Sequence, residues 1–290
     1  MKRRAFVTGG LSAAVWAAGW RPHVSPARIR FGYAAITWGG NDRQAIDDIA
    51  ALGFHGIQLR QSAVATWGDR PSELKQLLAD RKLTFVALSS GDVSLDPAAE
   101  PETLAQHARH ARFVRDAGGR YLQVIDQRPR GRDPEPDDYR RMGRLLSEIG
   151  RRSADVGIPL GYHNHMGALG QSPADVARVL DAADPTFVRL ELDTAHYQQA
   201  GGDPAEAVRR YADRLLFLHV KDLDASDRFV ELGRGTVDFK AVFAALDAIT
   251  FDGWAVVELD SVPDAARTPK ESGAIARRYL EAQGRWNDAR

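Results

Sequence analysis

From residue 28 onward, short apolar runs alternate with longer segments in which hydrophobic residues recur at helical spacing. The apolar runs are rich in Val, Ile, Leu, Phe and Tyr and are bounded by Gly, Pro or Asp, as buried strands are. We therefore expect strands within residues 28–36, 54–60, 83–90, 120–126, 158–165, 188–196, 215–222 and 254–260. The segments between and after them predict helices over residues 41–52, 71–82, 101–118, 135–157, 173–183, 203–213, 238–249 and 265–284.

Several predicted helices begin with residues that are typical of helix N-termini. Short polar side chains accept hydrogen bonds from the free N–H groups of the first turn, and Pro fits the first helical position. Such residues are Asp42, Ser172-Pro173, Asp203-Pro204 and Asp238.

The alternation of strands and helices continues without a low-complexity linker, which favours a single (β/α)8 barrel over residues 28–290. A doubly wound open sheet is the alternative. That fold usually places a glycine-rich phosphate loop after its first strand. Here the stretch AAITWGGND (34–42) follows instead, so the barrel is the better prediction.

Residues 1–27 have a different pattern. Lys2, Arg3 and Arg4 precede an apolar stretch over 11–20, which is too short to span a bilayer but suits a signal peptide. The adjacent arginines resemble a twin-arginine signal, which exports folded proteins. We expect cleavage after Ala27 and a periplasmic location. An ordinary N-terminal segment is the alternative.

The composition narrows the classes of partner. Among 290 residues, Lys plus Arg and Asp plus Glu each number 39, so the formal charge is zero. That balance does not favour a nucleic-acid or acidic membrane partner. The chain has no Cys, so any metal must be held by His, carboxylate or amide groups. We expect a small-molecule substrate and no membrane span, and the oligomeric state stays open, a homo-oligomer included.

Polar side chains collect at the ends of the last four predicted strands. A (β/α)8 barrel brings these ends together on the face where active sites lie. Nitrogen and oxygen donors that converge there suit a divalent cation, for which we expect Mn²⁺, with Co²⁺, Mg²⁺ and Zn²⁺ as alternatives. The strand ends carry His163-Asn164-His165, Asp193-Thr194-Ala195-His196, His219-Val220-Lys221-Asp222 and Glu258-Leu259-Asp260.

With these motifs, the chain resembles the xylose-isomerase-like barrels, the sugar phosphate isomerase and epimerase superfamily, over essentially residues 28–285. The stretch YHNHMGALGQSP (162–173) is most similar to inosose dehydratases, which share His-x-His-Met-Gly followed by Gln and Thr or Ser. The other stretches that carry the resemblance are GFHGIQLR (53–60), LELDTAHYQQAGGDP (190–204), LFLHVKD (216–222), LGRGTVDF (232–239) and WAVVELD (254–260).

The resemblance implies that Asp193, His219 and Glu258 are metal ligands. Most relatives supply a fourth ligand from a Glu at the end of the fifth strand, where this sequence has none. His163 or His165 must replace that Glu, and the spacing favours His163. Because side chains two apart in a strand point the same way, both imidazoles face one side.

The replacement changes the charge of the predicted site. Two carboxylates and two neutral imidazoles balance a divalent cation, whereas a third carboxylate would leave a net negative charge. A less neutralised metal is the stronger Lewis acid toward a bound carbonyl. Gln58 and Gln171 stand where many relatives carry Glu, and we assign both to substrate binding.

Such a site suits removal of a proton next to a ketone, followed by loss of the oxygen substituent on the β-carbon. Glu258 is our candidate for the base, with a role as ligand only as its alternative. His165 and His196 are candidates for the acid or for holding substrate oxygens. Lys221 would place a positive charge beside the enolate, with a surface salt bridge as the alternative.

Two further residues are candidates for substrate contacts. Trp38 follows the first strand and could stack on a sugar ring or belong to the core. The glycine-containing loop over 231–239 could fold over the pocket with Arg234 directed at substrate, or be a flexible turn. His107 and His110 lie among arginines on a predicted helix, which indicates a solvated face without a functional role.

Three functions remain in competition. The preferred one is a metal-dependent lyase that acts on a keto-sugar or keto-cyclitol, as an inosose dehydratase or as a 3-keto-glycoside lyase. Export would favour the glycoside. The second is a sugar isomerase or epimerase in which Glu191 or a loop residue supplies the missing acid. The third is a non-catalytic carbohydrate-binding barrel, against which the cluster of Asp193, His219 and Glu258 argues.

Overall fold

The computed structural model describes residues 28–286. The predicted export signal over 1–27, with its paired arginines and its cleavage site, lies outside the described residues. No helix within the described range is long and apolar enough to cross a membrane.

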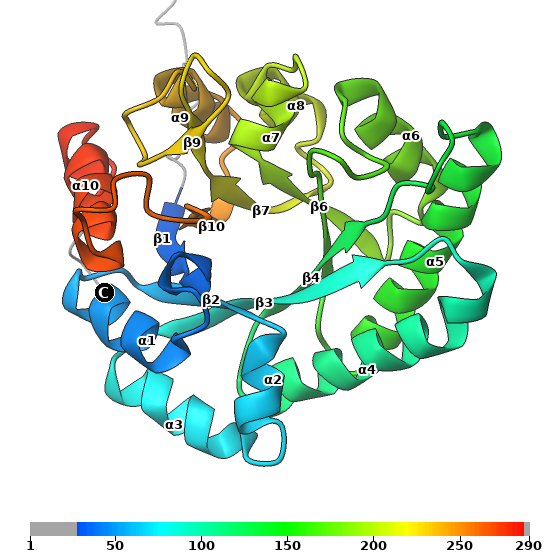
Figure 1. Ribbon diagram of the computed structural model, residues 1–290, viewed down its shortest axis with the longest axis horizontal. Helices are drawn as coiled ribbons and strands as arrows, with labels where there is room; N and C mark the ends of the chain where they lie inside the picture. The colour runs from blue at the N-terminus through cyan, green and yellow to red at the C-terminus, as the bar shows by residue number, and fades with distance from the viewer. Residues whose placement is uncertain (1–27, 287–290) are drawn as a thin grey trace, which may run out of the picture.

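Eight strands close into a parallel barrel, which confirms the predicted (β/α)8 fold (Figure 1). The order around the barrel is β1-β10-β7-β6-β5-β4-β3-β2. Each barrel strand therefore lies between the barrel strands that precede and follow it in the chain, and the pairing of β1 with β10 closes the barrel. The barrel strands are β1 (Arg28–Ala34), β2 (Gly56–Arg60), β3 (Thr84–Val93), β4 (Tyr121–Asp126), β5 (Leu160–His163), β6 (Val188–Asp193), β7 (Leu215–Val220) and β10 (Asp252–Val257).

Helices surround the barrel and hide its outer surface (Figure 1). Each helix predicted from the sequence is present, with ends that differ by a few residues. These helices are α1 (Asp42–Ala51), α3 (Pro71–Asp80), α4 (Glu100–Asp116), α5 (Pro136–Ala154), α6 (Pro173–Ala182), α8 (Pro204–Arg210), α9 (Phe239–Ala248) and α10 (Pro269–Ala282).

Several short elements were not predicted because each is too brief for a periodic pattern. They lie mainly in the loops at the carboxyl ends of the strands. They are η1 (Ala35–Trp38), α2 (Ser62–Trp67), η2 (Pro97–Ala99), α7 (Thr194–Gln199) and the two-stranded sheet of β8 (Asp222–Leu223) and β9 (Phe229–Val230).

The predicted helix starts are largely correct. The side chains of Ser172, Asp203 and Asp238 accept hydrogen bonds from the backbone N–H groups of the first turns of α6, α8 and α9. The cap of α1 is Asn41 rather than Asp42, since the Asn41 side chain accepts from the Gln44 backbone. Such caps satisfy N–H groups that have no partner within the helix.

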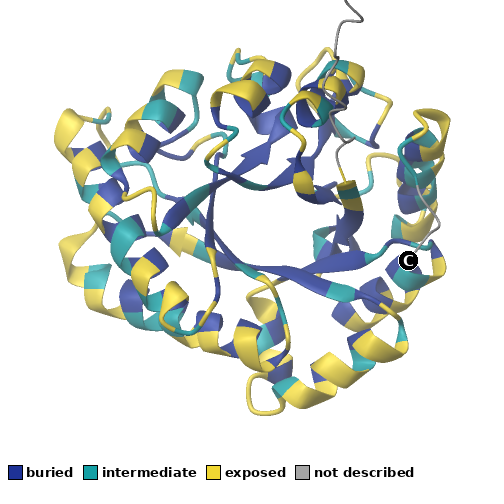
Figure 2. Cartoon of the chain, turned by 180° about the vertical axis from the view of Figure 1, so that it is seen from behind, coloured by how far each residue is buried: buried dark blue, intermediate teal, exposed yellow. Residues whose placement is uncertain are grey.

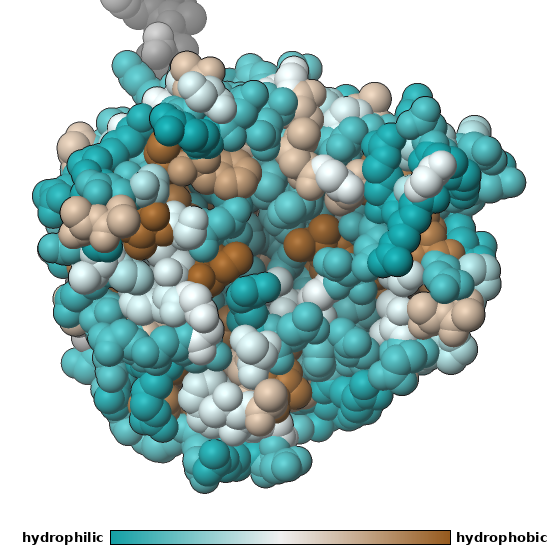
Figure 3. All heavy atoms as spheres, viewed as in Figure 1, coloured by the Kyte–Doolittle hydropathy of each residue, from teal (hydrophilic) through white to brown (hydrophobic). Residues whose placement is uncertain are grey.

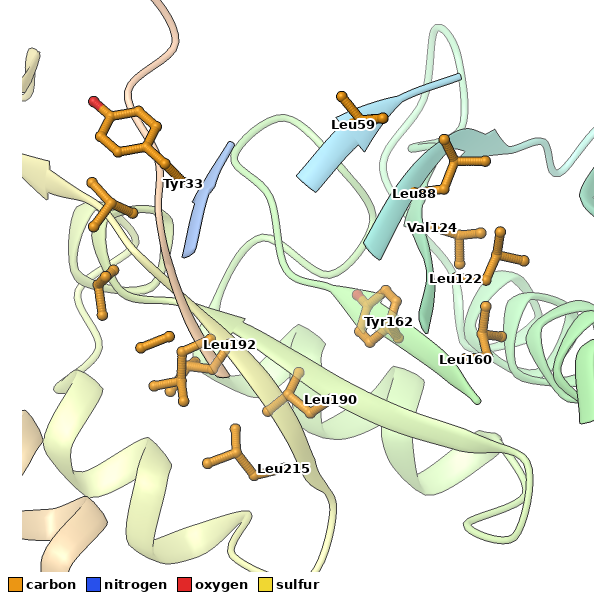
Figure 4. Packing of buried hydrophobic residues seen from close by; sticks show 14 of the residues in the cluster. Tyr33, Leu59, Leu88, Leu122, Val124, Leu160, Tyr162, Leu190, Leu192 and Leu215 are labelled. Atoms are coloured by element: carbon orange, nitrogen blue, oxygen red, sulfur yellow. The ribbon is translucent and has the colours of Figure 1, made fainter. Parts of the chain in front are cut away.

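Successive side chains along each strand point alternately to the helices and into the barrel. Leu122, Val124 and Leu160 lie side by side against the helical layer (Figure 4). Gln123 and Gly161, which are paired across β4 and β5, belong to the opposite set. Most strand residues are buried, whereas the helices expose their outer faces (Figure 2). The surface seen in Figure 3 is mainly hydrophilic.

Below the polar carboxyl ends of the strands, the barrel interior contains an apolar layer. Phe217, Trp254 and Val256 belong to a separate cluster of buried residues inside the barrel. The Tyr121 ring stacks on Phe217 with centroids 5.3 Å apart. His219 lies two residues after Phe217 on β7, on the same side of the strand, and the two ring centroids are 6.2 Å apart. The apolar cluster therefore forms the floor on which the polar groups rest.

The prediction that His107 and His110 form a solvated face of α4 is wrong. Their exposed fractions are 1% and 8%, and their Nδ1 atoms lie 2.6 Å and 2.8 Å from the Ser90 hydroxyl oxygen. Residues three apart share one side of a helix, and this side packs on the barrel. Arg109 and Arg112 point to the solvent side instead.

Candidate active site

The polar strand ends predicted from the sequence meet on one face of the barrel. Asp193 closes β6 and pairs in register with His219 on β7, while His163 closes β5 and pairs with Glu191. Glu258 directly follows β10. The side chains of His163, Asp193, His219 and Glu258 are all buried. The barrel thus brings together the four residues that the sequence proposed as metal ligands.

The potential ligand atoms of this cluster are close to one another. His163, Asp193 and His219 each offer one atom, and these atoms all lie within 4.8 Å of one another. The Nδ1 atom of His219 lies 2.6 Å from Oε2 of Glu258 and 3.6 Å from Oδ2 of Asp193. A second grouping of the same kind joins His163 with His165 and His196. His163 belongs to both.

The hydrogen bonding of these atoms fits a metal site. His163 Nδ1, Asp193 Oδ2 and His219 Nδ1 are buried, and none of them makes a hydrogen bond of good geometry, although His219 Nδ1 lies 2.6 Å from Oε2 of Glu258. A buried polar group without a partner costs about 1–3 kcal/mol, so three such atoms together need an explanation. Imidazole and carboxylate donors of this kind match Zn²⁺ and Mn²⁺. The residues present therefore fit a divalent cation.

The Nε2 atom of His219 has two neighbouring side chains as partners. Its Nε2–H donates to Oε1 of Gln58 over 2.9 Å and also lies 2.5 Å from Oε1 of Glu191. A partner on one ring nitrogen fixes the tautomer and leaves the other nitrogen free for a metal. Gln58, predicted to bind substrate, lines the pocket but also orients this ligand. Glu191 is fully buried beneath the cluster.

The charges around Glu258 favour its carboxylate form. Burial by itself would raise the pKa of Glu258, but His219 and Lys221 hold it well below its usual range. Burial lowers the pKa of His163, which keeps this imidazole in the neutral form that metals bind. Burial raises the pKa of Glu191 to about 7.

Lys221 is fully buried, so the alternative of a surface salt bridge is wrong. Its Nζ donates to Oδ1 of Asp260 over 2.6 Å and to Oε1 of Glu258 over 3.4 Å. Burial opposes the charged form, but the neighbouring carboxylates raise the pKa of Lys221 above its usual value. The ammonium group therefore compensates the carboxylates on this side of the site.

Of the two acid candidates, the structure favours His165. This ring lines the pocket and is half-buried, whereas His196 is 2% exposed and lies behind it, with ring centroids 3.9 Å apart. Burial lowers the pKa of His196 to about 3, which favours its neutral imidazole form. Met166 connects the two rings, because its carbonyl lies 2.7 Å from Nδ1 of His165 and its N–H donates to Nδ1 of His196.

Some of these side chains line a cavity of about 180 Å³ at the carboxyl end of the barrel. Its wall is mainly polar, with apolar groups from β1, η1 and β4. The lining residues are Ala34, Ile36, Gln58, Arg60, Ser89, Gln123, Ile125, His163, His165, His219, Glu258 and Asp260.

Gln123 is a pocket residue that the sequence analysis missed. It is 1% exposed, and neither its Nε2 nor its Oε1 has a hydrogen-bond partner. An amide that is buried without partners at a cavity wall is ready to bind hydroxyl groups. The available signal was a polar residue inside the apolar run of residues 120–126, at a position that faces the barrel axis.

Trp38 and Gln171 do not contact the pocket, contrary to the substrate-binding roles predicted for them. Trp38 lies in the core, where its Nε1–H donates to Oδ2 of Asp48 over 3.0 Å, so the packing alternative is correct. Gln171 accepts a hydrogen bond from the Gly167 backbone and supports the loop after β5. Neither side chain is among the residues that line the cavity.

The loop over 231–239 does not fold over the pocket, and Arg234 is not directed at it. The Asp222 carboxylate accepts hydrogen bonds from the backbone N–H groups of Gly233 and Gly235, which anchors the loop to β8. Arg234 lies 3.8 Å from Glu231, and 46% of its side chain is exposed. Its predicted contact with substrate is therefore not supported by the geometry.

Comparison with known proteins places this site in a family context. The profile of the family described as xylose isomerase-like TIM barrel matches residues 46–281. An inosose dehydratase of Lacticaseibacillus casei is 28% identical over 298 aligned residues, which cover 88% of this chain and 97% of that protein.

Two solved structures show the same fold. The IolI protein with a bound zinc atom has a TM-score of 0.78 and 15% identity, with 89% of this chain and 99% of that chain covered. The D-allulose 3-epimerase of Methylomonas sp. in complex with D-allulose has a TM-score of 0.72 and 23% identity, with coverage of 90% and 98%.

Proposed function

The chain belongs to the xylose isomerase-like TIM barrel family, and we propose that it is a carbon–oxygen lyase of the dehydratase type that acts on a keto-cyclitol or keto-sugar. One observation carries the proposal. A single cavity combines ligand atoms without partners, the carboxylate of Glu258 and the half-buried imidazole of His165. The similarity to an inosose dehydratase over most of both chains supports the reaction type.

His163, Asp193, His219 and Glu258 would hold the divalent cation. When bound, such a cation polarises a ketone oxygen and stabilises the negative charge that develops there. Lys221 adds a positive charge beside these residues, where its ammonium group contacts the carboxylates of Glu258 and Asp260.

The remaining steps are proton transfers by side chains of this chain. Glu258 lines the cavity as a carboxylate and accepts the proton from the carbon next to the ketone. His165 faces the same cavity, and the Met166 carbonyl accepts a hydrogen bond from its Nδ1–H. That bond orients the ring so that the protonated form can donate from Nε2 to the departing oxygen.

Hydroxyl groups of the substrate find partners on the opposite wall. Gln123 offers an amide donor and an amide acceptor, neither of which is engaged elsewhere. Its neighbour across the sheet, Ser89, lines the same cavity. A site that pairs buried polar groups with substrate hydroxyls discriminates strongly against analogues that lack them.

The isomerase or epimerase alternative needs a second acid in reach of the substrate. Glu191 was the candidate, but it contacts His219 from below and does not line the cavity. Glu191 therefore cannot supply that acid directly to a substrate in the cavity.

The test is turnover of a ketone of the predicted class. Purified protein with Mn²⁺ is incubated with an inosose and with 3-keto-glucosides, and ultraviolet absorbance is followed. We expect an enone band that grows with time and is absent after chelation with EDTA. Interconversion of sugar isomers without enone would contradict the proposal, and so would binding without turnover.

A further inference from the structure

A second cleft of about 320 Å³ lies beside the catalytic cavity. Ile125 and His165 line both spaces, so the acid candidate stands at their junction. The second cleft lies between the loops that follow β4 and β5, and it is lined by Asp92, Ile125, Asp126, Gln127, Arg128, Arg130, His165, Met166, Gly167 and Ala168.

A third cleft extends the path along the rim. It also measures about 320 Å³ and shares Gln127, Arg128 and Arg130 with the second. Arg132 and Asp138 lie in this third cleft and form a bidentate pair, with N–O distances of 2.6 Å and 2.7 Å. A substrate with one ring needs only the first cavity, so the further clefts leave room for a longer ligand.

The second cleft carries balanced charge. Its formal charges come from Asp92, Asp126, Arg128 and Arg130, two of each sign. Carboxylates accept hydrogen bonds and guanidinium groups donate them, whereas a hydroxyl group does both. A wall of this composition matches a neutral polyhydroxylated ring. An anionic group would face two carboxylates.

Asp126 provides a buried acceptor in this cleft. It is 2% exposed, and its Oδ2 accepts from the Tyr162 hydroxyl over 2.8 Å and from the Gly170 backbone over 3.0 Å. Its Oδ1 accepts no hydrogen bond of ordinary geometry. The carboxylate is thus fixed by one oxygen, while its other oxygen is buried without a hydrogen bond of good geometry.

Arg130 provides the matching donor. No hydrogen bond or ion pair joins its side chain to any residue in the described range 28–286. Arg128 is paired only with Asp133, whose side chain is 98% exposed, and such surface pairs contribute little. Both guanidinium groups can therefore turn to a ligand at small cost.

We propose that the second cleft is a leaving-group subsite, which binds a glycosyl unit expelled from the β-carbon. The inference rests on the proposed function and specifies its substrate class as a keto-glycoside. The glycosidic oxygen would lie beside His165, with the keto ring in the first cavity and the departing sugar in the second.

The elimination balances without an oxidant, a reductant or water. Glu258 takes the proton from the carbon next to the ketone, and the electrons of that C–H bond form the C=C bond. The C–O bond to the departing sugar breaks, and its oxygen keeps the electron pair and receives a proton from His165. The products are an enone and a free sugar. Exchange with solvent then returns both residues to their starting protonation states.

The first experiment compares two ketones that differ only in the leaving group. We expect a 3-keto-disaccharide to have a kcat/KM about tenfold higher than 3-keto methyl glucoside, as one or two added hydrogen bonds imply. Arg130→Ala should remove this advantage and leave the methyl glucoside rate unchanged. Arg140→Ala is the matched control, because Arg140 lies on α5 outside both clefts and is 66% exposed.

A second experiment measures the subsite without turnover. Calorimetry with Mn²⁺-loaded protein compares trehalose, sucrose and cellobiose with methyl glucoside, none of which has a ketone to react. We expect at least one disaccharide to bind about tenfold more tightly, with the difference lost in Arg130→Ala only. Equal affinities would overturn the subsite, as would an advantage that survives in Arg130→Ala. Tighter binding of glucose 6-phosphate than of any disaccharide would assign the cleft to an anion instead.

The two proposals fail separately. Absence of enone from every ketone refutes the lyase, whereas the calorimetric comparison does not depend on catalysis. Enone from inosose with no preference for a disaccharide in either experiment retains the lyase and rejects the subsite.

Discussion

The rings of His163 and His165 lie 5.6 Å apart at an angle of 72°, and each ring has different surroundings. His163 is 2% exposed and lies within the Asp193 and His219 group, whereas His165 is half-buried at the junction of two clefts. We therefore expect these two neighbouring histidines to have separate tasks.

This difference gives the first prediction. His163→Ala should lower metal affinity, because it removes a ligand atom that has no other partner. His165→Ala should keep the metal and lose mainly kcat, by roughly two to four orders of magnitude. Metal analysis and steady-state kinetics of both purified variants decide it. If the His165→Ala variant loses the metal and the His163→Ala variant keeps it, the assignment is reversed.

The second prediction separates the proposed metal-binding role of Asp193 from its structural role. This side chain also caps α7, because its Oδ1 accepts from the His196 backbone over 2.9 Å. Asp193→Asn keeps a capping side chain but removes the charge, so we expect metal loss with little change in melting temperature. His219→Ala should also lose the metal. Full metal content in either variant would show that the site is misplaced.

The third prediction concerns Gln123. Its amide makes no hydrogen bond within the described residues, so Gln123→Leu should not lower the free energy of unfolding. The same change should reduce kcat/KM by roughly tenfold to a hundredfold, because substrate hydroxyls lose their partner. Chemical denaturation and kinetics test the two halves. A destabilised protein with unchanged kcat/KM would assign Gln123 to the core instead.

The fourth prediction concerns acid stability. Burial lowers the pKa of His107 to about 4, with a contribution from neighbouring His110, whereas the unfolded chain titrates near 6.5. Between these values the unfolded state binds more protons, so the free energy of unfolding falls as the pH falls. The contribution is up to about 3 kcal/mol at pH 4.

A variant without the imidazole tests this effect. In His107→Gln the free energy of unfolding should depend less on pH between 6.5 and 4 than in the parent protein, when both are measured by urea denaturation. The two curves should run parallel above pH 7. Identical slopes between pH 6.5 and 4 would remove His107 as the titrating group.

The fifth prediction concerns location. If Arg3 and Arg4 form a twin-arginine signal, replacement of both by Lys should retain the protein in the cytoplasm. Cell fractionation with an antibody against the barrel measures the distribution. Unchanged periplasmic recovery would refute this signal.

The sequence by itself determined the architecture and which polar residues meet at the carboxyl ends of the strands. Strands and helices alternate strongly enough to specify a (β/α)8 barrel, because parallel strands need apolar runs and the crossover helices need one apolar face. That fold brings strand ends to one face whatever the loops do. The proximity of His163, Asp193, His219 and Glu258 follows from their positions in the chain.

Only the tertiary structure decided which polar residues reach the cavity. Trp38 and Gln123 both stand at barrel strands or just after them, yet the first packs in the core and the second lines the cavity. His107 and Arg109 lie on one helix, and only the packing of α4 on the barrel shows that the former is buried. Side-chain direction in loops and on helix faces depends on contacts between segments distant in the chain, which local patterns do not contain. The clefts around Arg130 arise from such contacts as well.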